Sequence, residues 1–420
     1  MKNTESRPSG YWDLARTFLR ISLLGFGGPN AHLALMLDDV VDRQGWITRE
    51  HFLHLVAATN LLPGPNSSEV AIHIGYTQRG WRGAFTTGIA FLLPTLVLVT
   101  LFSALYFRFG TLPAVEGLFW GLKPAILAVI LAAGWKLGKA SLGFPENLSP
   151  LLGALAVGGL LASFFYDRLE VPAMVVGGLI TWALFRSRPG GGSSERSVPR
   201  GSRPESRPDH PESRGEHPDG GMKLSSWIPP IAAPVAVVSG LLPAAGSLGH
   251  LFLFMCGAGA VLFGGGYMLV ALLEPFVVGS FGWVTADQFL DGIALTQAVP
   301  GPIVTLVAFV GFAVAGVPGA VVATVGIYLP SFAAVLLVAP HLERWRQLDG
   351  FRAALKGVNA VVAGAILGVG LTLLPSGLPD YWAAGIFLLA LVGLVRFKAP
   401  AVWIVAGGLV LGGVRLALIG

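Results

Sequence analysis

A proline–glycine–proline element followed by four polar residues, PGPNSSE at 63–69, interrupts a long apolar stretch of the sequence. Both prolines lack a backbone N–H and Gly64 is conformationally free, so a continuous helix must break here. Asn66 and Glu69 have the spacing of a capping box, in which Asn66 caps a new helix and Glu69 reaches back to the cap amide. The start of that helix would present free N–H groups and a positive dipole end, an arrangement that binds anions.

Lys123 is the strongest cationic candidate for contact with an anion. It lies in the apolar run FWGLKPAILAVI, next to a proline. Burying an ionised side chain in a membrane is expensive unless it is paired, so such residues are functional candidates by default. The alternatives for Lys123 are extension to the membrane interface and pairing with a buried carboxylate such as Glu69 or Glu116.

Four further charged residues are candidates for ion coupling or charge pairing. Arg20 lies about two turns before the glycines at 27–28. It could equally well face the mouth of the cavity or act as a positively charged anchor on the cytoplasmic side. Glu69 could cap a helix, pair with Lys123 or carry a coupling proton, and capping is the simplest of these roles. Glu274 and Asp291 are the carboxylates of the second half of the chain to test for proton coupling.

Uncharged donors and glycines at the breaks complete the predicted substrate site, because consecutive glycines let the backbone approach a ligand closely. The first half is expected to recognise the ligand and the second half to serve more as a scaffold, because four polar residues follow the first PGP whereas Ile303, Val304 and Thr305 follow the second. The predicted substrate-binding residues are Gly27, Gly28, Asn30, Asn60, Gly64, Asn66, Ser67, Ser68, Lys123, Gly264, Gly265, Gln297, Gly301 and Thr305.

The composition predicts an all-α polytopic membrane protein. Of the 420 residues, 54% are hydrophobic and only 12% are charged, whereas soluble domains carry about 25% charged residues. Apolar runs such as 90–105 and 321–339 are interpreted as long enough to cross a bilayer, and they are continuous rather than alternating, which argues against a β-barrel. The net charge of +5 is distributed over the ends of apolar runs, so no nucleic-acid partner is expected. The single cysteine, Cys256, excludes an intrachain disulfide and a cysteine-based metal site, and no cofactor is expected.

The two halves of the sequence repeat each other in register. A Phe-Gly-Gly element, a GW-x-T-x-x-x-FL segment and a PGP element recur in the same order at nearly constant spacing. The matching segments are 26–28 and 263–265, 45–53 and 282–290, and 63–65 and 300–302. An internal duplication follows, with broken helices at corresponding positions of both copies.

The predicted organisation is a first repeat at 1–186, a disordered hydrophilic linker at 187–226, an extra transmembrane segment at 227–244 and a second repeat at 245–420. Two six-helix halves and the extra segment give about 13 transmembrane segments. An odd segment between the copies inverts the second copy in the membrane. The distribution of Lys and Arg favours a cytoplasmic N-terminus and a periplasmic or extracellular C-terminus.

The duplicated elements, with GFGGP at 25–29, resemble the chromate transporter family in its long, two-domain form. The resemblance implies an inner-membrane transporter of 13 spans that exports chromate and confers chromate resistance, with sulfate as a competing oxyanion. The long linker departs from the compact family pattern.

Inverted repeats with interrupted helices are typical of secondary transporters, whose sites lie near the middle of the membrane. The alternative transport function is exchange or uptake of sulfate or another small anion. A membrane-embedded enzyme is disfavoured because the chain has no H-E-x-x-H or G-x-S-x-G motif. The expected partners are the oxyanion and the lipid bilayer, and a homodimer is compatible with the sequence.

Overall fold

The structure is a computed structural model in which every described element is helical. It describes residues 10–26, 28–59, 62, 64–110, 112–142, 149–165, 169–186, 247–263, 266–338 and 349–419. The predicted linker and extra transmembrane segment lie outside the described residues. The same holds for four of the predicted site residues, Gly27, Asn60, Gly264 and Gly265.

The helices fall into two sets in chain order. The first set is α1 (Tyr11–Leu24), α2 (Pro29–Met36), η1 (Leu37–Arg43), α3 (Arg49–Thr59), α4 (Asn66–Phe109), α5 (Pro113–Leu142), α6 (Pro150–Phe165) and α7 (Glu170–Arg186). The second set is α9 (Leu248–Ala260), α10 (Met268–Glu274), η3 (Pro275–Ser280), α11 (Ala286–Ala298), η4 (Ile303–Thr305), α12 (Leu306–Val338), α14 (Asp349–Thr372), α15 (Leu374–Gly377), α16 (Tyr381–Val395) and α17 (Ala401–Ile419).

Helix α4 is a hairpin whose two arms meet at a sharp turn. Its backbone leaves the helical region at Arg79 and Gly80, where Gly80 has φ +61°. A Cβ on Gly75 would collide with the carbonyl of Gly83, and the Thr87 hydroxyl donates to the Ala71 carbonyl at 2.8 Å. In a straight helix Gly75 and Gly83 would lie about 12 Å apart along the axis, and Ala71 and Thr87 about 24 Å apart. The short arm, 66–78, therefore packs back against the long arm, 81–109.

Helix α12 repeats this hairpin in the second half of the chain. Its turn is at Ala315 and Gly316, whose φ and ψ values match those of the first turn to within 10°. A Cβ on Gly311 would collide with the carbonyl of Gly319, which repeats the close approach in α4. Because unrelated helices would not share a turn and a glycine contact at matching positions, the backbone supports the duplication predicted from sequence.

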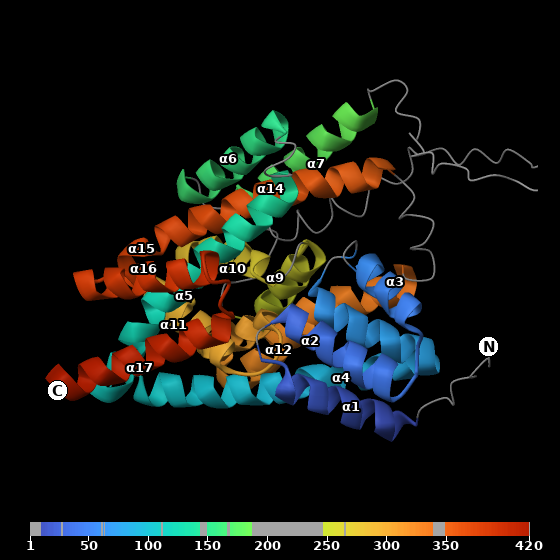
Figure 1. Cartoon of the computed structure of the whole chain (residues 1–420), viewed down its shortest axis with the longest axis horizontal. Helices are drawn as coiled ribbons and strands as arrows, with labels where there is room; N and C mark the ends of the chain where they lie inside the picture. Colours follow the sequence, from blue (N-terminus) through green and yellow to red (C-terminus); the bar gives the residue numbers. More distant parts are fainter. Residues whose placement is uncertain are drawn as a thin grey trace, which may run out of the picture.

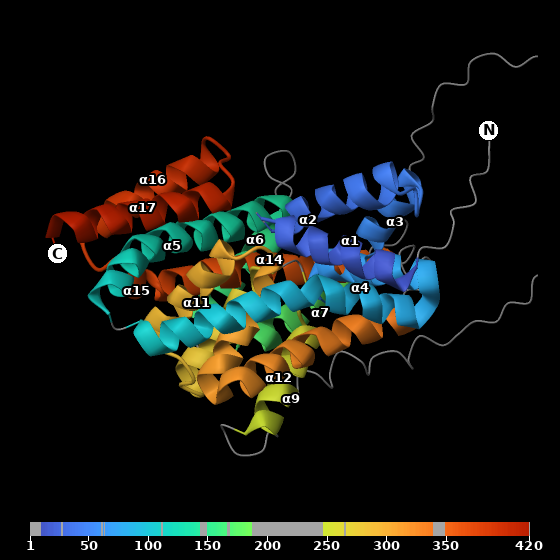
Figure 2. The ribbon, with the colours of Figure 1, turned by 90° about the horizontal axis from the view of Figure 1, so that it is seen from below.

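The hairpins pack against each other and connect the two sets of helices. Helix α4 packs against α1 and α12, and α12 also packs against α9. Helix α14 lies along α6 and α7, while α5 is flanked by α14, α16 and α17. Figures 1 and 2 show α1 starting at one end of the molecule and α17 finishing at the other.

The long arms of the hairpins carry apolar stripes that face outward. On α4, large apolar side chains are exposed at every fourth position from Phe85 to Leu105, and on α12 from Val317 to Leu329. Residues four apart share one face of a helix, so each stripe is continuous. Within the described ranges, five helices are long and apolar enough to cross a membrane. Such surfaces would aggregate in water and suit lipid, which makes this a multi-pass membrane protein.

Candidate functional site

Two helix breaks from opposite halves of the chain cross each other. The backbone N–H of Gly64, in the first PGP element, donates to the Leu262 carbonyl at 2.6 Å. The backbone N–H of Gly301, in the second PGP element, donates to the Gly25 carbonyl at 3.2 Å. Gly25 and Leu262 each begin a Phe-Gly-Gly-type break. Each PGP break is therefore tied to the glycine break of the other half.

Both PGP glycines sit where no other residue fits. Gly64 has φ +143° and Gly301 has φ +125°, which side-chain-bearing residues rarely adopt. A Cβ on Gly64 would collide with Ser331 Oγ and Glu69 Oε1, and a Cβ on Gly301 would collide with Thr95 Oγ1. Thr95 and Ser331 occupy equivalent positions, each directly after the proline of a long arm. The same arrangement is thus built twice.

The two breaks differ in how their polar groups are satisfied. At the second break, the Thr95 hydroxyl donates to the Pro300 carbonyl at 3.0 Å and the Thr305 hydroxyl donates to the Pro302 carbonyl at 2.7 Å. At the first break, Ser331 and both carboxyl oxygens of Glu69 are buried without a hydrogen-bond partner in the described structure. The hydroxyls at the second break are therefore paired with backbone carbonyls, whereas the side-chain oxygens of Glu69 and Ser331 at the first break are unpaired in the described structure.

The predicted capping box at Asn66 and Glu69 is wrong. Pro65 has an extended backbone and takes the cap position of α4, and its carbonyl accepts from the N–H groups of Ser68 and Glu69 at 2.9 Å and 3.1 Å. Asn66 is already inside the helix, where its Oδ1 accepts from the Thr59 hydroxyl at 2.5 Å. The Glu69 side chain lies against Gly64 instead of returning to a cap amide.

Five residues form what we call the first-break cluster: Gly64, Ser68, Glu69, Tyr328 and Ser331. The Ser68 and Tyr328 hydroxyls are close to each other, but neither has a hydrogen-bond partner of standard geometry in the described residues. Tyr328 and Ser331 are one turn apart on α12, so they present their hydroxyls on one face. The sequence prediction missed both residues, although a tyrosine and a serine in an apolar run could have suggested them.

The remaining predicted residues do not join this cluster. Ser67 is fully buried and its hydroxyl also has no partner among the described residues. Gly28, with φ +84°, precedes α2, and Asn30 is exposed in the first turn of that helix. The Gln297 amide donates to the Tyr267 hydroxyl at 2.6 Å, and Glu274 ends α10 directly before a proline.

Lys123 lies in a separate, acidic cavity of about 450 Å³. Its ammonium group is 2.7 Å from Asp287 and 3.8 Å from Asp291. The Tyr106 hydroxyl donates to Asp291 at 2.7 Å, and Glu116 also lines the cavity. Lys123 is thus paired with Asp287 and Asp291 across the two halves, not with Glu69 or Glu116 as the sequence suggested. Three carboxylates around one cation make this a poor site for a dianion.

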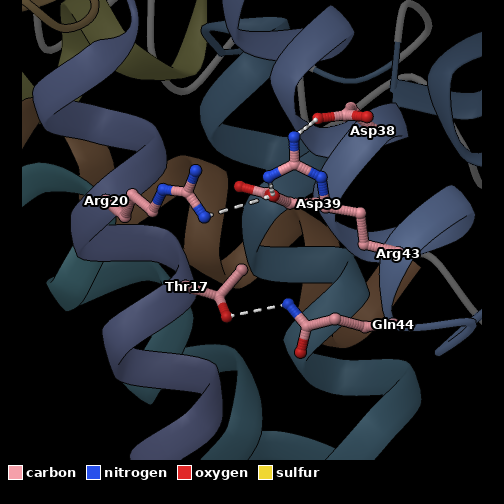
Figure 3. Close-up of polar contacts among 6 residues, drawn as sticks. All are labelled: Thr17, Arg20, Asp38, Asp39, Arg43 and Gln44. Carbon is pink, nitrogen blue, oxygen red and sulfur yellow. Dashed lines mark hydrogen bonds and ion pairs between the residues drawn. The ribbon is translucent and has the colours of Figure 1, made fainter.

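Arg20 forms a charge pair at the edge of the first half. Its guanidinium is 3.6 Å from Asp39 on η1, and Arg43 approaches the same carboxylate at 3.1 Å (Figure 3). Arg43 also contacts Asp38 at 2.9 Å, and the Gln44 amide donates to Thr17 on α1 at 3.0 Å. These contacts join α1 to η1, and they place Arg20 outside the first-break cluster.

Comparison with known proteins identifies the family. A family model described as "Chromate transporter" matches residues 12–182 and 249–413, which is most of the chain. The chain belongs to the chromate transporter family. No solved structure matches it.

Three relatives show the extent of the similarity. A chromate transport protein of Cupriavidus metallidurans is 30% identical over 97% of this chain and 93% of its own length. A chromate transport protein of Pseudomonas aeruginosa is 31% identical over 86% of this chain and 80% of its own length. A probable chromate transport protein of Synechococcus elongatus is 27% identical over 91% of this chain and 88% of its own length. Membership of this family supports a role in chromate transport rather than in enzyme catalysis.

Proposed function

We propose that this chromate transporter exports chromate across the cytoplasmic membrane and binds it at the first-break cluster. The observation that carries the proposal is the set of buried polar groups there that lack partners: Ser68, Glu69, Tyr328 and Ser331. A buried polar group left unsatisfied costs about 1–3 kcal/mol. A bound tetrahedral oxyanion would supply acceptors for three hydroxyl donors at once.

The local backbone favours the same site. The cluster lies in the first turn of α4 and against the long arm of α12, so both halves contribute to it. The N-terminus of a helix carries a partial positive charge that stabilises anions. The equivalent groups at the second break are occupied by backbone carbonyls, which supports the expectation that the first half recognises the ligand and the second half acts as a scaffold.

We propose that the two halves form an inverted repeat, with matching breaks in both. The reciprocal bonds, Gly64 to Leu262 and Gly301 to Gly25, are what a two-fold axis between the halves would produce. The first hairpin turn carries Arg79 and Arg82, while the second, at 315–318, has no charge. Basic residues favour the cytoplasmic side, so the two turns would lie on opposite faces. The segment at 227–244 would then cross the membrane between repeats 1–186 and 245–420, giving about 13 spans.

The membrane potential favours export of an anion. Moving one charge through about 100 mV is worth about 2.3 kcal/mol, so a dianion leaving a cell that is negative inside gains about 4.6 kcal/mol. Export therefore needs no second ion, whereas uptake would need a coupled cation or an exchanged anion. Sulfate has the same shape and charge, and exchange of sulfate is the competing transport function.

Uptake of radiolabelled chromate into everted membrane vesicles tests the proposal, because eversion turns export into uptake. We expect accumulation that depends on the potential and falls at least about tenfold in a Ser68→Ala/Ser331→Ala double variant, which loses two hydrogen bonds to a charged group. Ser103→Ala is the control, since Ser103 donates to Val99 within the long arm of α4. Sulfate flux without chromate flux would favour the competing function, and wild-type flux in the double variant would place the site elsewhere.

A further inference from the structure

We infer that Glu69 and the bound chromate share one proton, and that this shared proton lets the site choose chromate over sulfate. The inference rests on the proposed site at the first-break cluster. It goes further by naming the protonation state of the complex and the group that sets selectivity.

Glu69 is the one member of the cluster that can carry a negative charge at neutral pH. Its carboxyl group is fully buried, and both oxygens lack a hydrogen-bond partner in the described structure. It lies against Gly64 and near Ser331, where α4 packs against α12. A carboxylate that only stabilised the fold would be paired with a cation or capped by amides.

No described charged side chain interacts with the Glu69 carboxyl group. The titratable groups on the elements around it include Tyr328 on α12, His73 one turn further along α4 and His32 on α2, while Arg20 on α1 is paired with Asp39. His73 makes its ring contact with Tyr76, and His32 packs against Phe91. None of these supplies a positive charge that could balance both a carboxylate and a dianion.

A carboxylate and an oxyanion in contact repel each other strongly in a water-poor site, because the local dielectric constant is low. One proton between a carboxyl oxygen and an oxyanion oxygen turns this repulsion into a charge-assisted hydrogen bond. The proton can arrive on the oxyanion or on Glu69, and the complex is the same in either case.

The shared proton distinguishes two oxyanions of the same shape and charge. Chromate is a base that takes up a proton near neutral pH, whereas sulfate does so only in strong acid. A hydrogen bond shared with a carboxyl group is stronger when the oxyanion oxygen is more basic, so Glu69 favours chromate. Serine and tyrosine hydroxyls alone would bind both anions with similar geometry.

The inference has a stoichiometric consequence. The shared proton leaves with the chromate on the far side and is replaced from the near side in the next cycle, so one net negative charge moves per transport cycle instead of two. Proton movement and charge movement can both be measured, so the inference does not depend on flux alone.

The test uses the full-length protein in liposomes under an imposed potassium diffusion potential. Chromate and sulfate fluxes are measured from pH 6 to pH 9, with a pH-sensitive dye reporting protons on the trans side. Wild type, E69Q and the control H73Q are compared, after size-exclusion chromatography has shown that each is folded. His73 is titratable and lies on the same helix, but it is outside the cluster.

For wild type and H73Q we expect about one proton per chromate and a chromate flux that decreases as the pH rises. In E69Q the glutamine amide donates to either oxyanion regardless of its basicity. We therefore expect the flux to lose its pH dependence and the proton signal to disappear. The chromate-to-sulfate flux ratio should fall by about tenfold or more, as expected for loss of one charge-assisted hydrogen bond.

The outcomes separate the inference from the function on which it rests. Absence of chromate flux in wild type would refute the proposed function. Chromate flux in wild type, with the same pH profile, proton count and selectivity in E69Q, would refute the shared proton alone. A folded E69Q that binds neither anion would also count against it, because an amide keeps a donor in the site.

Discussion

The N–H of Gly64 and the carbonyl of Leu262 form a 2.6 Å hydrogen bond that ties a break in the first half to a break in the second. Gly301 and Gly25 repeat the relationship at 3.2 Å. Each bond positions a PGP element over a glycine-rich turn from the other half. The polar groups at the crossing are therefore held by both halves together, and a change at either glycine should disturb the shared site.

Gly64→Ala should destabilise the protein by about 2 kcal/mol or more, because alanine is strained at this φ and its Cβ meets Glu69 and Ser331. Chromate transport should be lost as well, since the collision falls on the first-break cluster. Thermal unfolding of the purified protein and vesicle uptake measure the two effects. Gly153→Ala on α6, where a Cβ would meet nothing within 4 Å, should leave both unchanged. An active, equally stable Gly64→Ala variant would contradict the geometry of the crossing.

Ser331→Ala and Thr95→Val should separate ligand binding from structural support. Ser331 has no partner in the described structure, so its loss should leave the unfolding temperature nearly unchanged and reduce transport by about tenfold. Thr95 donates to Pro300, so its loss should destabilise the second break by about 1 kcal/mol. Transport and unfolding measured on both variants test this difference. The reverse pattern would assign ligand recognition to the second half.

The helix breaks and their duplication could be predicted from sequence, because proline and glycine restrict or free the backbone locally. PGP at 63–65 and 300–302 marks both positions, and the structure has a helix beginning after each. Tyr328 and Ser331 could not be assigned to the first break in this way. They are more than 250 residues from Gly64 in the chain, and only the packing of α12 against α4 brings them there.

The charge pairs show the same limit. The sequence left three roles open for Lys123: contact with the anion, extension to the membrane interface and pairing with a buried carboxylate. Its partners, Asp287 and Asp291, come from α11 of the other half, so their identity depends on how α5 and α11 pack. The capping box failed for a local reason, since Pro65 rather than Asn66 took the cap position.

Lys123→Ala should destabilise the protein by about 3 kcal/mol, because it leaves the buried carboxylate of Asp291 without a cation. A Lys123→Ala/Asp291→Asn double variant should recover much of this loss, since the amide still accepts from Tyr106. Asp287→Asn should cost less than about 1 kcal/mol, because 57% of that side chain is exposed. Thermal unfolding of the purified variants checks all three. Equal stability of the single and double variants would show that Asp291 does not need the cation.

Equivalent positions in the two hairpin turns should lie on opposite faces of the membrane. Trp81 and Val317 directly follow the two turns, and 59% and 56% of their surfaces are exposed. Cys256 is the single cysteine, so Cys256→Ser provides a cysteine-free background for Trp81→Cys and Val317→Cys. A membrane-impermeant maleimide should label Val317→Cys in intact cells and Trp81→Cys only in everted vesicles.

This labelling pattern follows from the charges beside each turn. Arg79 and Arg82 flank the first turn and favour the cytoplasmic side, whereas residues 315–318 carry no charge. Labelling of both cysteines from the same side would mean that the halves are related by an axis along the membrane normal. Both PGP breaks would then open toward the same face of the membrane. Chromate would have no equivalent path to the crossing from the opposite face. Alternating access by exchange of the two halves therefore requires the labels to fall on opposite sides.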